Sequence, residues 1–205
     1  MSAPTYIRRH INKFVGDKPF SIRDCLIYGS RNVVDQVFHR MLKEGRIVRV
    51  ARGVYIKSSA PQPGAMEIIA VKAAAFGRTI VTHGSKAGPK LNKVFKADDK
   101  LVFASSGATS SFAVGERIVH LVHASDRKMK LADSPTGLTI RALWHLGKKL
   151  INVETAALLV FNFRKHDRKE LRLSGSLMPH WMRECFARFA RMDCYRWDVE
   201  PMPVR

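Results

Sequence analysis

The first part of the chain places apolar residues at helical spacing, separated by short turn segments. Between residues 6 and 15 the apolar residues form one stripe and the basic residues face away from it, which predicts an amphipathic helix. A second, short helix is predicted over residues 22–28. Ser21 is a suitable N-cap residue for this helix, and Asp24 stands three positions later, which is close to a capping box.

A third helix is predicted to begin after Ser30, another N-cap candidate, and to end at Gly45. At about 100° per residue, its apolar residues fill one half of its surface. The other half carries polar side chains, with Arg40 at the boundary: Arg31, Asn32, Asp35, Gln36, His39 and Lys43. Side chains of these types contact base edges and phosphates in DNA complexes. An ordinary solvated helix surface is the alternative interpretation.

The segments RIVRV and GVYIK, residues 46–50 and 53–57, are predicted to be short strands joined by a tight turn. Gly53 permits the positive φ angle that such a turn needs. Helix, short helix, glycine turn, longer helix and hairpin is the order of a winged helix-turn-helix. In that fold the third helix enters the major groove, and the hairpin is the wing. A basic edge strand that only prevents aggregation is the alternative.

The segment IKSSAPQPGAMEI predicts a domain boundary, because proline interrupts both helices and sheet pairing. We therefore expect a DNA-binding domain over residues 1–58 and a larger domain over residues 65–205. Overall, the sequence predicts an α+β protein. Its N-terminal winged helix-turn-helix is followed by a larger α+β domain with a small, mostly antiparallel sheet and C-terminal helices.

Helices and strands alternate in the predicted second domain. Helices are expected at residues 66–76, 85–94 and 135–147. Strands are expected at residues 78–83, 100–105, 116–124 and 128–132, with a Gly/Ser-rich turn region at 106–115. Residues 153–205 are predicted to be mostly helical. The amphipathic segment 178–192 is expected to pack on its own domain, although a dimer contact or a membrane-surface helix would show the same pattern.

The net charge of the chain predicts a partner. The 205 residues include 36 Lys and Arg but only 17 Asp and Glu, a formal net charge of +19. Such an excess usually indicates a polyanionic partner, which is nucleic acid or, less often, an anionic membrane. Both predicted domains are basic, so both could contact the same polyanion.

The remaining composition points to the cytoplasm. Cys25, Cys185 and Cys194 are odd in number and widely spaced, which disfavours a disulfide framework or a zinc site. No apolar run approaches the ~18 residues of a transmembrane helix, and the N-terminus lacks the apolar core of a signal peptide. We expect a cytoplasmic protein with no membrane partner.

No set of polar residues predicts catalysis. The segment SSGATSS lacks the pattern of a phosphate-binding loop, so a hairpin loop is favoured. His120 and His123 lie three apart on a predicted strand, where they would face opposite sides and make a poor metal pair. His83 and Ser85 complete no set of nucleophile, base and acid. We expect no enzymatic activity, no catalytic residue, no metal and no cofactor.

The segment SRNVVDQVFHRMLKEGRIVRVARGVYIK resembles the AbiEi-type antitoxins and related bacterial winged-helix proteins. The resemblance rests on Ser30-Arg31, on the Val-Asp-Gln step at residues 34–36, and on Arg52-Gly53-Val54-Tyr55. Weaker similarity continues through AMEIIAVKAAAFGRTIVTHGSKAGPKLN, KLVFASSGATSSFAVGERIVHLVHAS and GLTIRALWHLGKK, so that it spans about residues 5–150. The segment THGSKAGPKLN departs from the family pattern through the added charges of Lys86 and Lys90.

The resemblance implies a function. Such antitoxins bind inverted repeats in their own promoter and repress a toxin–antitoxin operon, and the toxin is a nucleotidyltransferase-like protein. In the best-known subtype the antitoxin neutralises the toxin without forming a stable complex, while many winged-helix relatives are solitary regulators. An inverted repeat needs two copies of the protein, which would meet either as a homodimer or only on the DNA.

These considerations assign candidate DNA contacts. The groove-facing helix supplies Ser30, Arg31, Asn32, Gln36, His39, Arg40 and Lys43, and the wing supplies Arg46, Arg49 and Arg52. Arg31 could bind guanine and Gln36 adenine. A further backbone-binding surface is expected at Lys86, Lys90 and Lys93. Two other functions share the charge pattern: a protein-interaction module that holds a toxin, and an RNA-binding protein, which the lack of an aromatic stacking platform disfavours.

Overall fold

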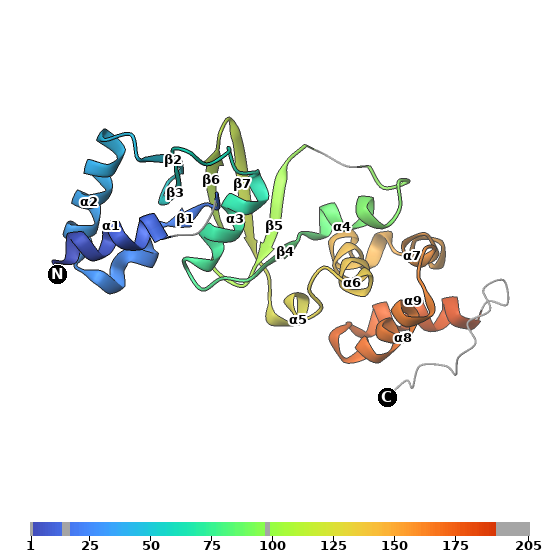
Figure 1. Ribbon diagram of the computed structural model, residues 1–205. Helices are drawn as coiled ribbons and strands as arrows, with labels where there is room; N and C mark the ends of the chain where they lie inside the picture. The colour runs from blue at the N-terminus through green and yellow to red at the C-terminus, as the bar shows by residue number, and fades with distance from the viewer. Residues whose placement is uncertain (1, 14–16, 97–98, 192–205) are drawn as a thin grey trace. The chain divides into compact units, whose positions relative to one another are not determined.

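The protein has a mixed α+β fold, and its described residues form two small sheets (Figure 1). The predicted fold class is confirmed to this extent. The computed structural model describes residues 2–13, 17–96 and 99–191. The described chain divides into two compact units. Unit 1 comprises residues up to 80 together with 110–120, and unit 2 comprises 81–109 together with the residues from 121 onward.

Four helical segments belong to unit 1: α1 Ala3–Lys13, the 3₁₀ helix η1 Ile22–Tyr28, α2 Arg31–Lys43 and α3 Ala65–Ala74. The predicted end of the first helix, residues 14–15, lies outside the described residues. The predicted capping box is confirmed: the Ser21 hydroxyl accepts a hydrogen bond from the Arg23 N–H, and the Asp24 carboxylate accepts one from the Ser21 N–H. Gly45, in the left-handed region at φ 66°, follows the end of α2.

The first sheet is antiparallel with the strand order β1-β3-β2. Its strands are β1 Phe20–Ser21, β2 Ile47–Ala51 and β3 Val54–Lys57. The predicted hairpin is therefore present, but its turn contains only Arg52 and Gly53, and Gly53 has the expected positive φ of 82°. Strand β1 was not predicted, because two residues are too short to show a period of two.

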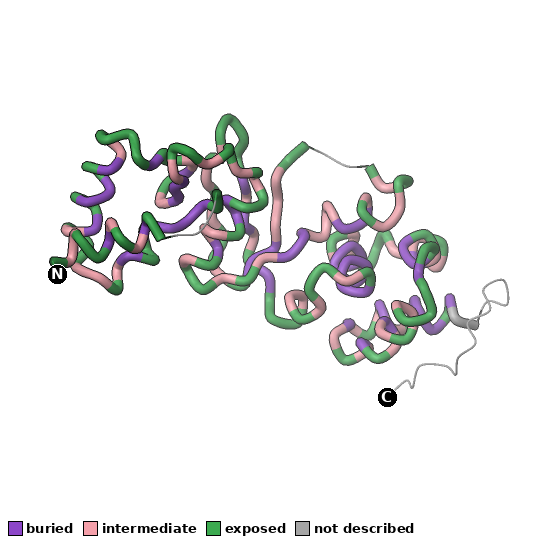
Figure 2. The backbone as a smooth tube through the Cα atoms, in the orientation of Figure 1, coloured by how far each residue is buried: buried purple, intermediate pink, exposed green. Residues whose placement is uncertain are grey.

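The core of unit 1 lies where α1, η1 and α2 pack together and against the sheet. Ile7 and Ile11 of α1 are fully buried, as is Val34 of α2. Phe38 and Tyr55 meet edge to face, with ring centroids 4.9 Å apart. Figure 2 shows α2 alternating between buried and exposed positions, as expected for a helix with one apolar face.

Helix α3 also belongs to unit 1, although it follows the Pro-rich stretch. Ile68 of α3 packs against Ala51 and Val54 of the hairpin, and Val114 lies beside them. Contacts between α3 and the first sheet bring this helix into the N-terminal unit. The predicted division at residues 58–65 therefore does not coincide with the division between the units.

The second sheet has the strand order β4-β5-β7-β6. Its strands are β4 Ile80–Thr82, β5 Leu101–Ser105, β6 Ser110–Val114 and β7 Arg117–His123. Strand β6 occupies half of the stretch 106–115 that was predicted as a turn region, and that part of the prediction is wrong. Its serines are typical of loops, but Ser110 and Phe112 are less exposed than Ser111 and Ala113, which is the period of a strand. The glycine and serine content of this stretch is typical of turns, so the alternation was not recognised as a strand.

Unit 2 is mainly helical. Its helices are α4 Gly84–Leu91, α5 Asp126–Met129, α6 Pro135–Leu146, α7 Val153–Val160, α8 Lys165–Leu173 and α9 His180–Arg191, with 3₁₀ segments η2 Lys148–Leu150 and η3 Ser174–Leu177. The strand predicted over residues 128–132 is wrong. Ser125 stands in the N-cap position and Asp126 in the first turn, and these residues favour a helix at this point.

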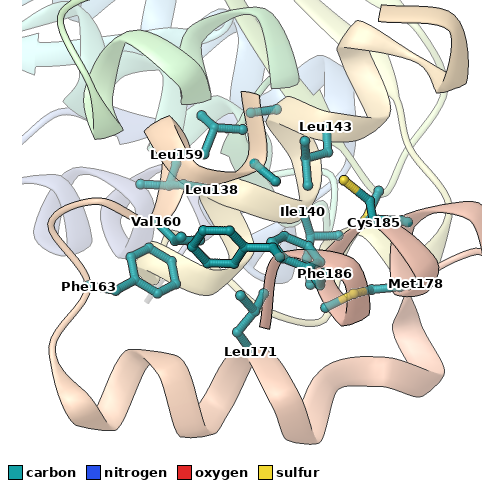
Figure 3. Packing of buried hydrophobic residues seen from close by; sticks show 14 of the residues in the cluster. Leu138, Ile140, Leu143, Leu159, Val160, Phe163, Leu171, Met178, Cys185 and Phe186 are labelled. Atoms are coloured by element: carbon teal, nitrogen blue, oxygen red, sulfur yellow. The ribbon is translucent and has the colours of Figure 1, made fainter. Parts of the chain in front are cut away.

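Helices α6 to α9 each bury apolar side chains in one core (Figure 3). Leu143 of α6, Leu171 of α8 and Phe186 of α9 are almost fully buried there. The expectation that the terminal amphipathic helix packs on its own domain is confirmed, because Met182 and Phe189 are also buried in this core. None of the described helices combines the length and apolarity needed to cross a membrane.

Candidate nucleic-acid interface

The exposed side of α2 carries the predicted groove-facing side chains. The buried positions Val34, Val37, Phe38 and Met41 orient the helix, because they repeat at spacings of three and four residues. All seven predicted positions are consequently exposed: Ser30, Arg31, Asn32, Gln36, His39, Arg40 and Lys43. Ser30 stands at the N-cap, but its hydroxyl makes no capping hydrogen bond. The polar half of α2 is therefore available to a partner.

Two of the predicted arginines are paired with acids close to them in the chain. Arg31 Nε lies 2.9 Å from the Asp35 carboxylate, and both side chains are about half exposed. Arg46 Nε lies 3.1 Å from the carboxylate of Glu44, which Arg8 also contacts. Exposed pairs of this kind contribute only about 0–1 kcal/mol. A phosphate can therefore replace the carboxylate at small cost.

The arginines of the hairpin lie on its solvent side. Arg49 and Arg52 are exposed. Ala51, which lies between them in the chain, and Val54, which follows the turn, are buried. The Arg49 guanidinium makes one weak contact, a 3.4 Å hydrogen bond from Nε to the Ala51 carbonyl. Arg52 stands in the two-residue turn between β2 and β3.

A pocket of about 280 Å³ joins α2 to the hairpin turn within unit 1. Four basic side chains from four elements line it: Arg23 of η1, Arg31 of α2, Arg52 of the turn and Lys72 of α3. None of the described residues that line it carries a carboxylate. The structure thus brings two predicted residues, Arg31 and Arg52, together with two that sequence reasoning missed.

Lys72 was missed because it belongs to a segment read only as an apolar helix. Its Nζ donates a 2.8 Å hydrogen bond to the Arg52 carbonyl and lies 4.6 Å from the centre of the Phe112 ring. Burial lowers the pKa of Lys72, and the neighbouring charges of Arg52 and Arg49 lower it further. A single lysine in an alanine-rich helix was the only signal for this position.

Arg23 was missed because the sequence pattern of the short helix predicted only its N-terminal cap. Its guanidinium lies over the Phe76 ring, 4.4 Å from the ring centre. This is the distance of a cation–π contact. Phe76, two residues beyond the end of α3, is itself 53% exposed, so the aromatic ring holds Arg23 at the edge of the pocket without burying it.

The three predicted lysines of the second surface belong to unit 2 and are not equivalent. Lys90 Nζ donates a 2.7 Å hydrogen bond to the Thr82 hydroxyl and lies 3.9 Å from the Asp133 carboxylate. Lys86 is partly buried, whereas Lys93 is exposed. Lys90 is thus exposed but paired with Thr82 and Asp133, which are partners that the sequence did not suggest.

The histidines of unit 2 have structural partners. His83 caps α4, because its Nδ1 accepts a 3.3 Å hydrogen bond from the Ser85 N–H. Burial lowers the pKa of His83, and the nearby His145 and Lys128 add to this shift. In unit 1, the His120 Nδ1 lies 2.8 Å from the Ser111 hydroxyl. Across the described ranges, no three His, Cys, Asp or Glu residues are grouped to hold a metal ion.

Comparison with known proteins links the chain to one family. Residues 7–171 match a family described as a family of unknown function, DUF6088. No match was found among the curated proteins or among the solved structures.

Proposed function

We propose that this chain, which belongs to the DUF6088 family, is a sequence-specific double-stranded DNA-binding protein of the winged helix-turn-helix type. Helix α2 would enter the major groove, and the β2–β3 hairpin would act as the wing. One observation carries the proposal. Arg31 at the start of α2 and Arg52 at the tip of the hairpin line the same pocket, as expected if helix and wing contact adjacent parts of one duplex.

The composition of the two surfaces supports separate roles. Asn32 and Gln36 are exposed, and their amides can read base edges, while arginines suit both guanine and phosphate. Lys43 and Arg46, near the other end of α2, would contact phosphates. The net charge of +19 supplies the attraction to a polyanion that is independent of sequence.

The resemblance of residues 30–57 to AbiEi-type antitoxins extends the proposal to a biological role. The protein would repress its own operon by binding promoter inverted repeats, two copies meeting as a homodimer or on the DNA. Its operon partner would be a nucleotidyltransferase-like toxin. This part of the proposal rests on the sequence motif and on the exposure of its polar residues Arg31, Gln36 and Arg52.

Binding to the DNA immediately upstream of the gene tests the proposal. Fluorescence anisotropy across a salt series would compare this duplex with a scrambled duplex and a structured RNA. Gln36→Ala is the informative variant, and Gln62→Ala, an exposed glutamine in the Pro-rich stretch, is its control. We expect tighter binding to the upstream duplex, reduced about 5- to 100-fold by Gln36→Ala alone.

Three results would contradict the proposal. Equal binding of every duplex, with a steep salt dependence and no effect of Gln36→Ala, would indicate a basic surface without base recognition. Preference for the RNA would favour the RNA-binding alternative. If neither nucleic acid binds, the protein-interaction alternative becomes the hypothesis to pursue.

A further inference from the structure

We infer that the pocket lined by Arg23, Arg31, Arg52 and Lys72 binds one phosphate group of the DNA backbone. The inference rests on the proposed function and deepens it, because it names the ligand of a specific site. It also assigns a role in DNA binding to α3, which lies outside the helix-turn-helix and wing segment.

The pocket has the chemistry of a phosphate site. Three guanidinium groups and one ammonium group line it, and arginine presents paired N–H donors that match phosphate oxygens. Its volume of about 280 Å³ is several times the roughly 30 Å³ of one water molecule in the liquid. A phosphate group can therefore enter together with a few bridging waters.

Two of the four cations are held in place before any ligand arrives. Lys72 is fixed by its hydrogen bond to the Arg52 carbonyl and by the Phe112 ring, and Arg23 rests on the Phe76 ring. Side chains that are already ordered lose little conformational entropy on binding. The arrangement therefore favours binding of an anion over an ordinary cluster of mobile surface lysines.

The start of α2 also favours an anion in the pocket. Arg31 is the first residue of this 13-residue helix, and the Ser30 hydroxyl makes no capping hydrogen bond to the first-turn N–H groups. Free N–H groups at a helix N-terminus favour anions. The same helix end carries Asn32 and Gln36, so a phosphate in the pocket would place the backbone of a duplex beside the exposed face of α2.

Electrostatics explains why the pocket needs a ligand. Burial lowers the pKa of Lys72, and the charges of Arg52 and Arg49 lower it further. The described lining residues include no acid, and Arg31 alone of the four cations is paired with a carboxylate, that of Asp35, among the ion pairs described. Like charges around one pocket repel each other, and a phosphate diester would relieve the repulsion. An acidic peptide would also relieve it, but only a phosphate backbone explains why the pocket adjoins side chains suited to base edges.

The salt dependence of DNA binding by the full chain tests the inference. Lys72→Met removes the charge and keeps the apolar stem, and Lys72→Arg keeps the charge. Lys169→Met, an exposed lysine of α8 in unit 2, is the control for the loss of one charge. We expect Lys72→Met to weaken specific and scrambled duplexes alike, about tenfold at low salt, and to lower the salt slope by about 1.

The variants separate a phosphate contact from a structural effect. Lys72→Arg should restore most of the affinity, and Lys169→Met should leave the slope unchanged. If Lys72→Met does not fold, Arg23→Gln gives the same test from another element. A wild-type slope in both variants, together with retained DNA binding, overturns the phosphate site while the proposed function stands.

Inorganic phosphate provides a measurement that does not depend on DNA binding. Thermal unfolding at constant ionic strength, with phosphate replacing chloride, should show stabilisation of the wild type that Lys72→Met reduces. Stabilisation without any duplex binding would mean that the pocket binds free phosphate and that the proposed function is wrong. If phosphate does not stabilise the wild type and no duplex binds, the phosphate site is overturned.

Discussion

Lys72 donates a hydrogen bond from its Nζ to the backbone carbonyl of Arg52, over a distance of 2.8 Å. The two residues lie on opposite sides of the Pro-rich stretch at residues 61–64. This bond, with the packing of Ile68 on the hairpin, joins α3 to the turn that presents Arg52. The geometry of the hairpin tip thus depends on a helix that was predicted to belong to another domain.

Removing the apolar contact between α3 and the hairpin should loosen the hairpin. Ile68 is only 2% exposed and packs on Ala51 and Val54, so Ile68→Ala should cost about 2–4 kcal/mol. The residues of unit 1 include no tryptophan. Hydrogen exchange measured by mass spectrometry is therefore the suitable method, with faster exchange expected in peptides covering residues 47–57.

Met66→Ala is the control for that experiment, because Met66 lies on the same helix and is 56% exposed. It should change the free energy of opening by no more than about 0.5 kcal/mol. Equal exchange in wild type and Ile68→Ala would mean that α3 does not stabilise the hairpin.

Removing the acid that pairs with Arg31 should strengthen DNA binding. In the free protein the Asp35 carboxylate lies 2.9 Å from Arg31 Nε, and both side chains are exposed. Asp35→Asn releases the guanidinium and removes a negative charge from the exposed face of α2. We expect affinity for duplex DNA to rise about threefold to tenfold at low salt, as measured by fluorescence anisotropy.

Glu154→Gln, an exposed acid of α7 in unit 2, removes the same charge elsewhere and should have a smaller effect. If both variants bind DNA equally well, the gain comes from net charge alone. An unchanged or lower affinity for Asp35→Asn would argue against Arg31 as a DNA contact.

The buried guanidinium of Arg141 should make Asp133 necessary for the stability of unit 2. Arg141 is only 3% exposed; it donates from Nη2 to the Asp133 carboxylate over 2.6 Å and from Nε to the Thr82 carbonyl over 2.9 Å. Asp133→Ala leaves a buried charge without its counterion. The free energy of unfolding should fall by about 2–4 kcal/mol. We expect the lower part of this range because the carboxylate is 44% exposed.

Urea unfolding followed by tryptophan fluorescence measures this loss, because Trp144 lies on the same helix as Arg141. Glu154→Ala, at an exposed position, should change the free energy of unfolding by about 0.5 kcal/mol or less. A similarly small change for Asp133→Ala would show that solvent compensates Arg141 without the pair.

Cys25 should resist alkylation in the folded protein. The thiol is fully buried, and burial, with a further contribution from the Asp24 carboxylate, raises the pKa of Cys25 from 9.0 to about 12. Only the thiolate reacts with iodoacetamide. At pH 8 we expect mass spectrometry to find Cys25 unmodified in native protein and modified in urea.

The same pKa shift predicts how stability changes with pH. Between about pH 9 and pH 12 the unfolded chain loses the Cys25 proton while the folded chain keeps it. The unfolded state then binds fewer protons, so this thiol's contribution to stability is present below pH 9 and lost as pH rises through that window. Native-state alkylation of Cys25 should accelerate over this range, beyond the increase seen for the same peptide in urea; a parallel increase would contradict the shift.

Much of the local structure could be predicted from short-range patterns. The Ser21 cap, the two sides of α2 and the positive φ of Gly53 depend on residues only a few positions apart. Helix periodicity, capping and turn preferences act over that range. The exposure of Asn32 and Gln36 follows directly from where the apolar residues of α2 fall.

Strand pairing was harder to predict, because a strand is stabilised by partners distant in sequence. Strand β1 pairs Phe20 with Tyr55, and two residues alone contain no detectable pattern. Strand β6 was concealed by its serines. Conversely, residues 128–132 had apolar character suitable for a strand but form a short helix and turn instead. Side-chain burial and cross-strand contacts, rather than intrinsic propensity, decide such cases.

By itself, the sequence determined which side chains α2 and the hairpin expose, because neighbouring residues decide helix faces and turns. Only the tertiary structure decided that Arg23 and Lys72 would join Arg31 and Arg52 around one pocket. Arg23 and Lys72 are separated by 49 positions in the chain, and nothing local relates them. Burial of Ile68 against Ala51 and Val54 brings α3 to the hairpin, and the hydrophobic effect that drives this burial specifies no partner until the whole unit packs.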